Sequence, residues 1–406
     1  MKKESAKRPA IVLGASTPAL GIVQSLGLKG VPCWACAPGR ELSTRSRYAN
    51  YWWIPDPRDD EAGMVERVAE LSAKLDRIPV LIPTVDQYAQ AIARHRPQID
   101  EFATACVADS EVVDLLIDKQ RFSDWAQSRA VRHPIAIAAM EYEPDRELRF
   151  PVVAKPRFPF YELSGCDLPF ELRCVVMNDV QAWDEFKRRY QRYLSHLLVQ
   201  EFVHGTAADM ISIGLYADRD SDIRGLFVGR KIRGYPPLWG DTRAGQNDMV
   251  PNSVLREVSR VVEELRYKGL AEFEYKIDRK SGEHFLIEIN PRSWSWIGIT
   301  LHTPADIPWI AYQDLVGGAP AKTWHNKDPG SIKYARIMLD FLNVVVQYRW
   351  TNPSLAMSPL AWWRTLSADR LVMAEFGRGD WPLAFWSLVH LFKSLLSLVL
   401  RRRKQL

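Results

Sequence analysis

Two acidic stretches near residue 280 carry the side chains best suited to chemistry. Glu272 and Glu274 alternate with apolar neighbours, Ser281-Gly282 is a turn-forming pair, and Glu288 and Asn290 alternate in the same way beyond it. Alternation at this period, interrupted by such a turn, predicts a β-hairpin. A turn centred there places Glu274 opposite Glu288 and Glu272 opposite Asn290. The opposite face is then expected to carry four apolar side chains, Phe273, Tyr275, Ile287 and Ile289.

Two carboxylates that face each other across a strand pair repel, so the arrangement is favourable when a cation lies between them. Two carboxylates and an amide form an all-oxygen ligand set, which suits Mg²⁺, an ion that keeps several waters and bridges substrate phosphates. We therefore predict a metal site at Glu274, Glu288 and Asn290, with Mn²⁺ as an alternative ion and Arg292 in reach of the same phosphates. The alternative interpretation is the solvated polar face of an ordinary hairpin.

The composition is that of a globular protein of two or three domains, with 406 residues, 47% hydrophobic and 25% charged. Four charges of the net +5 come from residues 401–404, so the rest of the chain has no basic field and no nucleic acid is expected as a partner. Residues 1–10 lack the apolar segment of a signal peptide, which makes a cytoplasmic protein the default. Five cysteines, with no second C-x-x-C beside Cys33 and Cys36, predict thiols rather than disulfides or a zinc site.

The first 109 residues are predicted to form an α/β domain. Apolar strands are expected at 9–13 and 31–37, joined by a helix that begins after Gly14. This βαβ opening lacks the G-x-G-x-x-G spacing and a ribose-binding acid, which argues against a dinucleotide site. The helix start would either receive an anionic substrate group or be a plain strand-to-helix turn. Asp86, just after a strand at 79–83, lies either where open α/β sheets bind ligands or at a helix cap.

The hairpin residues make the chain resemble a known superfamily. The acidic strand Phe273-Glu274-Tyr275, followed by residues 287–292 (IEINPR), is similar to the metal-binding signature of the ATP-grasp superfamily. Its members bind ATP between two α+β subdomains, and they usually ligate a carboxylate to an amine or thiol through an acyl phosphate. The resemblance covers about residues 9–320. It implies a fold of α/β and α+β type, with a Rossmann-like pre-ATP-grasp domain at 1–109, an ATP-grasp domain at 110–320 and an extension at 321–406.

The resemblance assigns several cations to the phosphates of ATP. Lys119, which follows the helix-capping Asp118, and Lys155, at the end of an apolar strand, match phosphate-binding lysines of the superfamily. Arg230 and Lys231 belong to a cluster of cations that would compensate the charge of a triphosphate. A solvated edge strand would carry the same cations without any ligand.

The strand at 197–203 resembles the hinge between the two ATP-grasp subdomains. The resemblance implies that Glu201 and the backbone of Phe202 and Val203 bind the adenine edge, and that Asp209 binds the ribose hydroxyls. For both carboxylates the alternative is an edge strand that carries an exposed acid.

The segment after Lys155 departs from the superfamily pattern. Most ATP-grasp enzymes cover the phosphates with the backbone amides of a glycine-rich flap, whereas residues 157–165 contain one glycine and several aromatic residues. This feature resembles a branch of predicted carboxylate–amine ligases related to D-aspartate ligase. We interpret it as a trait of that branch.

Residues 321–406 lie outside the resemblance and are predicted to be a helical extension. Helices are expected near 331–348, 360–366 and 383–400. The helix expected at 383–400 has a broad apolar face and is followed by an Arg-Arg-Arg-Lys cluster. Both features suit an interfacial helix that lies on the anionic inner face of a membrane. One alternative is docking on the protein's own core or on the second copy of a homodimer. The other is a membrane span, which Lys393 disfavours.

The hairpin, the cations and the resemblance to the ATP-grasp superfamily together predict an ATP- and Mg²⁺-dependent ligase that joins a small carboxylate to an amine. A bound carboxylate would attack the γ-phosphate, Mg²⁺, Lys155 and Arg292 would neutralise the transferring phosphoryl group, and the amine would displace phosphate. Trp294 and Trp296 are either core residues or walls of the acceptor pocket. The competing hypothesis is a non-catalytic, membrane-recruited scaffold that binds ATP, and only turnover separates the two.

Overall fold

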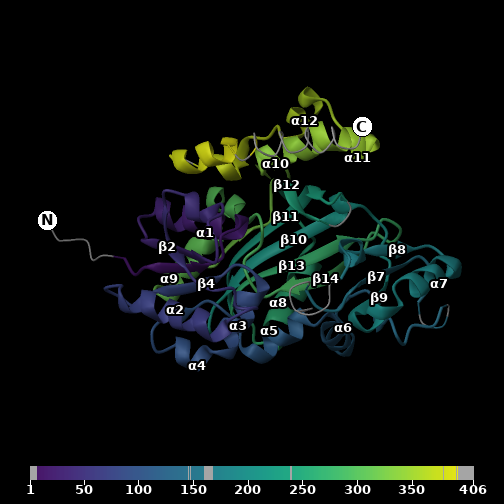
Figure 1. The fold of residues 1–406 in the computed structure, drawn as a ribbon, viewed down its shortest axis with the longest axis horizontal. Helices are drawn as coiled ribbons and strands as arrows, with labels where there is room; N and C mark the ends of the chain where they lie inside the picture. Colours follow the sequence, from purple (N-terminus) through teal and green to yellow (C-terminus); the bar gives the residue numbers. More distant parts are fainter. Residues whose placement is uncertain are drawn as a thin grey trace.

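The computed structural model describes residues 7–389 and 391, apart from 145, 147, 160–167, 238–239 and 378. Its N-terminal region is a parallel five-stranded sheet in the order β3-β2-β1-β4-β5, surrounded by helices (Figure 1). This confirms the predicted α/β opening. Its elements are β1 (Ala10–Leu13), α1 (Thr17–Leu28), β2 (Cys33–Ala37), β3 (Ala49–Trp53), α2 (Glu61–Ala73), β4 (Val80–Pro83), α3 (Asp86–Arg94), α4 (Arg96–Ile99), β5 (Thr104–Ala105), α5 (Ser110–Ile117) and α6 (Lys119–Ser128).

The central strands β1 and β4 are buried along their whole length, as expected of parallel strands covered on both faces. The turn after β1 requires glycine, because Gly14 has a φ of +120° and an added Cβ would lie 2.2 Å from Thr84 Oγ1. In β2, Cys33 and Cys36 are buried free thiols, and burial raises the pKa of Cys33 to about 12. The prediction of packed thiols is therefore confirmed for this pair.

A second, antiparallel sheet of four strands has the order β6-β9-β7-β8. It forms its own core, in which Trp183 of α7 packs with Leu172 and Val199. The predicted hinge strand is β9, and the strand that carries Lys155 is β7. The elements are β6 (Ala136–Ala138), β7 (Val152–Pro156), β8 (Val175–Met177), α7 (Val180–Arg189) and β9 (Leu197–Glu201).

The third sheet is the largest, with the path β14-β13-β10-β11-β12-β16-β17 and with β15 paired to β11. Its core is continuous with that of the N-terminal sheet, since Ile11 and Leu13 share one apolar cluster with Ile213 and Phe273. The elements up to the extension are β10 (Met210–Ala217), β11 (Ile223–Tyr235), β12 (Asp241–Asn247), α8 (Asn252–Glu264), β13 (Gly269–Ile277), β14 (His284–Asn290) and α9 (Ile307–Leu315).

Trp294 and Trp296, which follow β14, are fully buried core residues. They lie against glycines of the large sheet, because a Cβ on Gly214 would be 2.1 Å from Trp294 and one on Gly245 would be 2.7 Å from Trp296. Of the two alternatives raised by the sequence, packing is therefore the one that the structure supports.

The extension contributes strands as well as the predicted helices, so the prediction of a helical extension needs correction at those strands. Residues expected to begin a helix at 331 form β16 (Ile332–Ala335), which pairs with β12, and β17 (Arg370–Met373) pairs with β16. The extension also contains β15 (Thr323–His325), α10 (Ile337–Phe341), which runs through a π-helical segment (Leu342–Gln347) into α11 (Tyr348–Thr351), and α12 (Pro359–Thr365).

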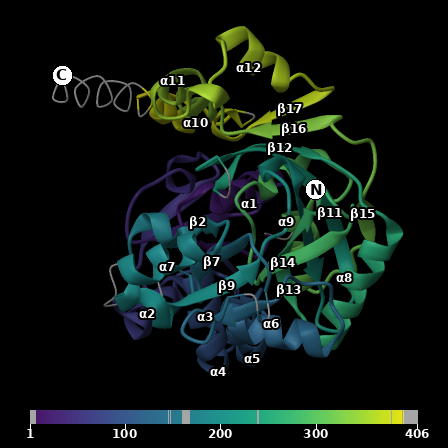
Figure 2. The same cartoon turned by 90° about the vertical axis from the view of Figure 1, so that its right-hand side faces the viewer.

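A buried ion pair fixes the extension to the large sheet. Asp340 on α10 is fully buried and accepts hydrogen bonds from Arg233 of β11 at 3.0 and 2.6 Å and from Trp362 Nε1 at 2.7 Å. The extension therefore forms an outer layer that belongs to the sheet (Figure 2). Residues 381–389 and 391 are helical, and the other residues of the helix predicted at 383–400 lie outside the described part of the chain. Within the described part of the chain, no helix combines the length and apolar character of a membrane span.

Candidate active site

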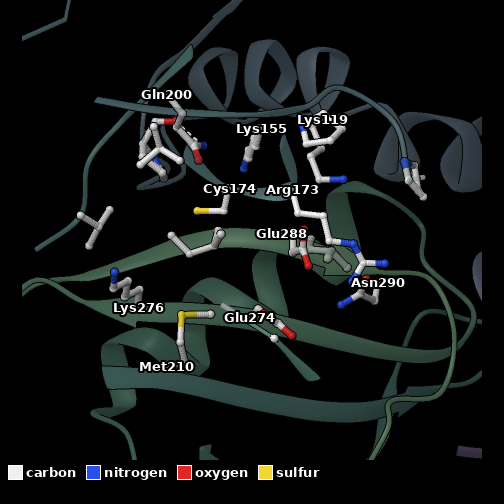
Figure 3. Close-up of a pocket in the computed structure, with 18 of the residues that line it drawn as sticks. Lys119, Lys155, Arg173, Cys174, Gln200, Met210, Glu274, Lys276, Glu288 and Asn290 are labelled. Atoms are coloured by element: carbon white, nitrogen blue, oxygen red, sulfur yellow. Dashed lines mark hydrogen bonds between the residues drawn. The ribbon is translucent and has the colours of Figure 1, made fainter. Parts of the chain in front are cut away.

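A cavity of about 680 Å³ lies between the small sheet and the hairpin of the large sheet (Figure 3). The small sheet and its neighbours contribute Lys155 and Gln200 to one wall, and the hairpin contributes Glu274 and Glu288 to the opposite wall. The predicted site residues that line the cavity are Lys119, Lys155, Glu201, Phe202, Val203, Lys231, Glu274, Glu288, Asn290 and Arg292.

The hairpin has the register that the sequence predicts. Glu272 pairs with Asn290 and Glu274 pairs with Glu288 across β13 and β14. The expected apolar face needs one correction, because a β-bulge follows the Glu274 pair and Leu286 becomes the partner of Tyr275. Leu286 is therefore fully buried, whereas Ile287, expected on the core face, lines the cavity.

A chain of hydrogen bonds holds the polar face of the hairpin in place. Ser212 donates to Glu272 at 2.8 Å, and Asn290 Nδ2 donates to the other oxygen of Glu272 at 3.2 Å. Arg292 donates to Asn290 Oδ1 at 3.1 Å and to Asp86 at 2.9 Å. Asp86, at the start of α3, thus positions Arg292 at the cavity. This contact gives a reason for the place of Asp86 just after the carboxyl end of β4.

The hairpin carboxylates differ in the charges that surround them. Burial alone would raise the pKa of Glu288, but Lys119, Lys155 and Lys231 outweigh it and hold that pKa below its usual value. Burial raises the pKa of Glu274, a rise that Lys231, 3.3 Å away, opposes and Glu288 increases. Glu288 is therefore the carboxylate most firmly ionised, and a bound cation would favour ionisation of Glu274.

Two lysines reach the cavity from elements that are tied together. Asp118 caps α6 by accepting from the backbone amide of Gln120 at 3.0 Å, and it also accepts two bonds from Arg157 at 2.8 and 2.7 Å. Arg157 directly follows β7, so this pair aligns Lys119 at the start of α6 with Lys155 at the end of β7. The predicted cap at Asp118 is confirmed.

The other end of the cavity is less polar. Phe202 and Val203 follow β9 there, and Lys276 Nζ lies 5.3 Å from the centre of the Phe202 ring. Figure 3 places Lys276 and Met210 at the end away from Lys119 and Asn290. An apolar slot with a few polar groups suits a planar base, and the opposite, basic end suits its phosphates.

The structure does not bring Asp209 and Arg230 to the cavity lining. The Asp209 carboxylate accepts from the backbone amide and the hydroxyl of Thr206, and it forms an ion pair with Arg279 at 2.8 Å. Arg230 pairs with Asp248. Successive residues of a strand point to opposite faces, so Arg230 and Lys231 cannot both face the cavity. Asp209 and Arg230, both predicted at the nucleotide, therefore lie outside the lining of this cavity.

This difference between strand neighbours makes a direct test. We expect Lys231→Met to weaken binding of MgATP about tenfold or more, because it removes an ammonium group from the cavity. Arg230→Met should change the dissociation constant less than about twofold, since its guanidinium serves Asp248 on the other face. Calorimetric titration of both variants measures this, and equal losses would contradict the assignment.

Sequence reasoning missed several residues of the cavity. Lys276, Cys174 and Arg173 line it, although none of them was assigned a role in the site from the sequence. Lys276 was detectable in principle, because it lies two residues after Glu274 on the same strand and so shares its face. Arg173 and Cys174 precede the short β8, and only the fold brings them opposite the hairpin. The glycine-poor flap lies largely outside the described residues.

The donor set at the hairpin fits a hard divalent ion. Glu274, Glu288 and Asn290 present oxygen atoms from adjacent paired positions. Among the residues that the structure describes, no three His, Cys, Asp or Glu side chains gather as a complete metal cage. Three oxygen donors leave further coordination positions, which nucleotide phosphates and water would fill around an ion such as Mg²⁺.

Comparisons with known proteins give one distant relative and many structural matches. No protein-family model matches the chain. A D-aspartate ligase from Enterococcus faecium (strain Aus0004) is 26% identical over 305 residues, which cover 70% of each chain. The N5-carboxyaminoimidazole synthetase of Staphylococcus aureus matches with a TM-score of 0.60 and 14% identity over 81% of this chain and 83% of its own.

Two further structures extend the comparison. The L-amino acid ligase of Bacillus licheniformis matches with a TM-score of 0.56 and 13% identity over 78% of this chain and 76% of its own. The biotin carboxylase domain of Hydrogenobacter thermophilus 2-oxoglutarate carboxylase was solved with MgADP, ADP and bicarbonate. It matches with a TM-score of 0.58 and 14% identity over 78% of this chain and 71% of its own. The chain therefore has the ATP-grasp fold, and the resemblance of its sequence to this superfamily is confirmed.

Proposed function

We propose that the protein is an ATP- and Mg²⁺-dependent ligase that joins a small carboxylic acid to an amine through an acyl phosphate. The observation that carries the proposal is the pair of walls in one cavity, with Lys119 and Lys155 facing Glu274 and Glu288. The first wall suits a polyphosphate, and the second suits the ion that accompanies it. The relative named D-aspartate ligase and the match to an L-amino acid ligase support this chemistry and favour amino acids as substrates.

Each part of the cavity has a role in this reaction. Lys119, Lys155 and Lys231 bind the phosphates, while Glu201 and the backbone of Phe202 and Val203 bind the adenine. Glu274, Glu288 and Asn290 hold Mg²⁺, which would neutralise phosphate charge when bound. Asp209 and Arg230 have no part in it.

Arg292 is the residue that we assign to the transferring group. As a carboxylate oxygen bonds to the γ-phosphorus, the bond from that phosphorus to ADP breaks, and the Arg292 guanidinium, fixed by Asp86, compensates the charge. The amine nitrogen then bonds to the acyl carbon, phosphate leaves, and the nitrogen loses a proton to solvent. Neither step forms a bond to a side chain of the protein, so the acyl phosphate is the only covalent intermediate that the reaction needs.

The first experiment is MgATP-dependent release of ADP by the purified protein. Both enantiomers of the amino acids and small carboxylic acids would be tested singly and with amine acceptors. We expect one acid to stimulate release at least about tenfold and an amide product to appear by mass spectrometry. If ATP binds but no acid in the set produces ADP or amide, the ligase proposal fails and the non-catalytic scaffold becomes the better hypothesis.

A further inference from the structure

The helix at residues 381–389 has two faces of opposite character. Leu383 is fully buried and Ala384 nearly so, which docks one face on the protein. Trp381, Phe385 and Leu388 are 78%, 71% and 50% exposed. Their spacing of four and then three residues places these apolar side chains on one stripe of the helix. The helix therefore presents an apolar face to its surroundings, although its other face is already packed.

Contacts at the start of the helix fix this orientation. Asp380 is almost fully buried and accepts hydrogen bonds from the Ser46 hydroxyl, from the backbone amide of Arg47 at 2.8 Å and from Gln24 at 3.4 Å. These three donors belong to the N-terminal domain. Asp380 thus ties the start of the helix to the N-terminal domain. The apolar stripe cannot turn inward without breaking this buried hydrogen-bond network.

A second element of the extension exposes apolar side chains as well. α12 has Leu360 at 60% and Trp363 at 52% exposure. Both figures show α12 and the 381–389 helix in the outer layer formed by the extension (Figures 1 and 2). Neighbouring exposed apolar side chains mark an interaction surface, as on the stripe of the 381–389 helix, and α12 adds exposed apolar residues to the same layer of the fold.

We propose that this outer face, defined as Trp381, Phe385, Leu388, Val389, Leu360 and Trp363, binds the surface of an anionic membrane. Tryptophan and phenylalanine are suited to the boundary between lipid headgroups and acyl chains. The sequence beyond residue 389 repeats apolar residues at helical spacing and ends in the basic run at 401–404, which complements anionic lipid.

The proposal is independent of the ligase chemistry, and co-sedimentation of the full-length protein with vesicles tests it. Vesicles with roughly a third phosphatidylglycerol in phosphatidylcholine carry the required negative charge, and pure phosphatidylcholine is the reference. We expect the natural protein to bind the anionic vesicles at least tenfold more strongly than the reference vesicles. The double variant Trp381→Glu with Phe385→Glu should bind the anionic vesicles at least tenfold more weakly than the natural protein. Raising the salt concentration should weaken binding of the natural protein.

A matched double variant controls for added charge. Ile78→Glu with Met140→Glu replaces two exposed apolar residues, 56% and 66% accessible, that lie outside the extension. It should bind vesicles as the natural protein does, and both double variants should keep the melting temperature. Vesicle binding unchanged by the Trp381 and Phe385 substitutions would overturn the proposal. A protein that does not bind vesicles but forms a concentration-dependent dimer would also overturn it. If the Trp381 and Phe385 substitutions dissociate that dimer, a second copy of the chain occupies this face.

Discussion

Glu288→Gln is expected to lower the turnover number by at least about 10²–10³-fold, the size of effect seen when one preorganised electrostatic group is lost from a reaction centre. Glu288 pairs directly with Glu274, and three lysines hold its carboxyl group ionised. Glutamine keeps the shape and one oxygen but removes the charge, so the divalent ion loses one of its two carboxylate ligands. Binding of ATP should weaken much less, because the lysine wall is unchanged. Steady-state ADP release, with a parallel titration of nucleotide, separates the two effects.

Glu283→Gln is the matched control for this substitution. Glu283 lies at the tip of the same hairpin, where it pairs with Arg132 and both side chains are about half exposed. Its change to glutamine removes the same charge without touching the cavity and should leave turnover within about twofold. Full activity in Glu288→Gln, or equal losses in both variants, would show that the hairpin face does not hold the ion.

The sequence predicted the hairpin correctly because two local rules agree there. Alternation fixes which side chains share a face, and the turn at residue 281 fixes the register, so the Glu274–Glu288 pairing follows without tertiary information. The bulge after that pair does not follow, because it depends on how Leu286 packs beneath the sheet. For that reason the faces of Leu286 and Ile287 were wrong, although Glu288 and Asn290 were placed correctly.

The errors elsewhere share a physical cause. Arg230 and Lys231 are adjacent cations, and only the packing of β11 decides which of them faces the cavity. Asp209 follows the hinge as expected, but the nearby Thr206 and Arg279 satisfy its carboxylate locally. β16 is four residues long and leads directly into a helix, so its sequence contains too little alternation to distinguish it from that helix. Local patterns predict elements, and long-range packing decides which polar groups remain available to a ligand.

Lys155→Met is expected to weaken binding of MgATP roughly 10- to 150-fold, the equivalent of one hydrogen bond to a charged group. Lys155 lines the cavity opposite Glu288, where burial lowers its pKa to about 8, an effect that Glu288 opposes and Lys119 increases. The ammonium group is therefore present at neutral pH and available to a phosphate oxygen. Methionine preserves the length and the apolar stem, so the loss reports the charge. Calorimetric titration at pH 7 measures it, and affinity that stays within twofold would refute the phosphate role.

The lowered pKa of Lys155 also makes nucleotide affinity depend on pH with a definite sign. Above a pH of about 8 the free protein has lost the Lys155 proton, so binding must first take up a proton from solvent. The dissociation constant of MgATP should then rise as the pH increases beyond 8, by at most tenfold for each pH unit. Lys155→Arg restores a charge that persists throughout this range and should bind with little pH dependence. The dissociation constants of Lys155→Met and of the natural protein could instead change in parallel between pH 7 and 10. In that case another group titrates, and Lys155 does not supply the charge that binds the phosphates of ATP.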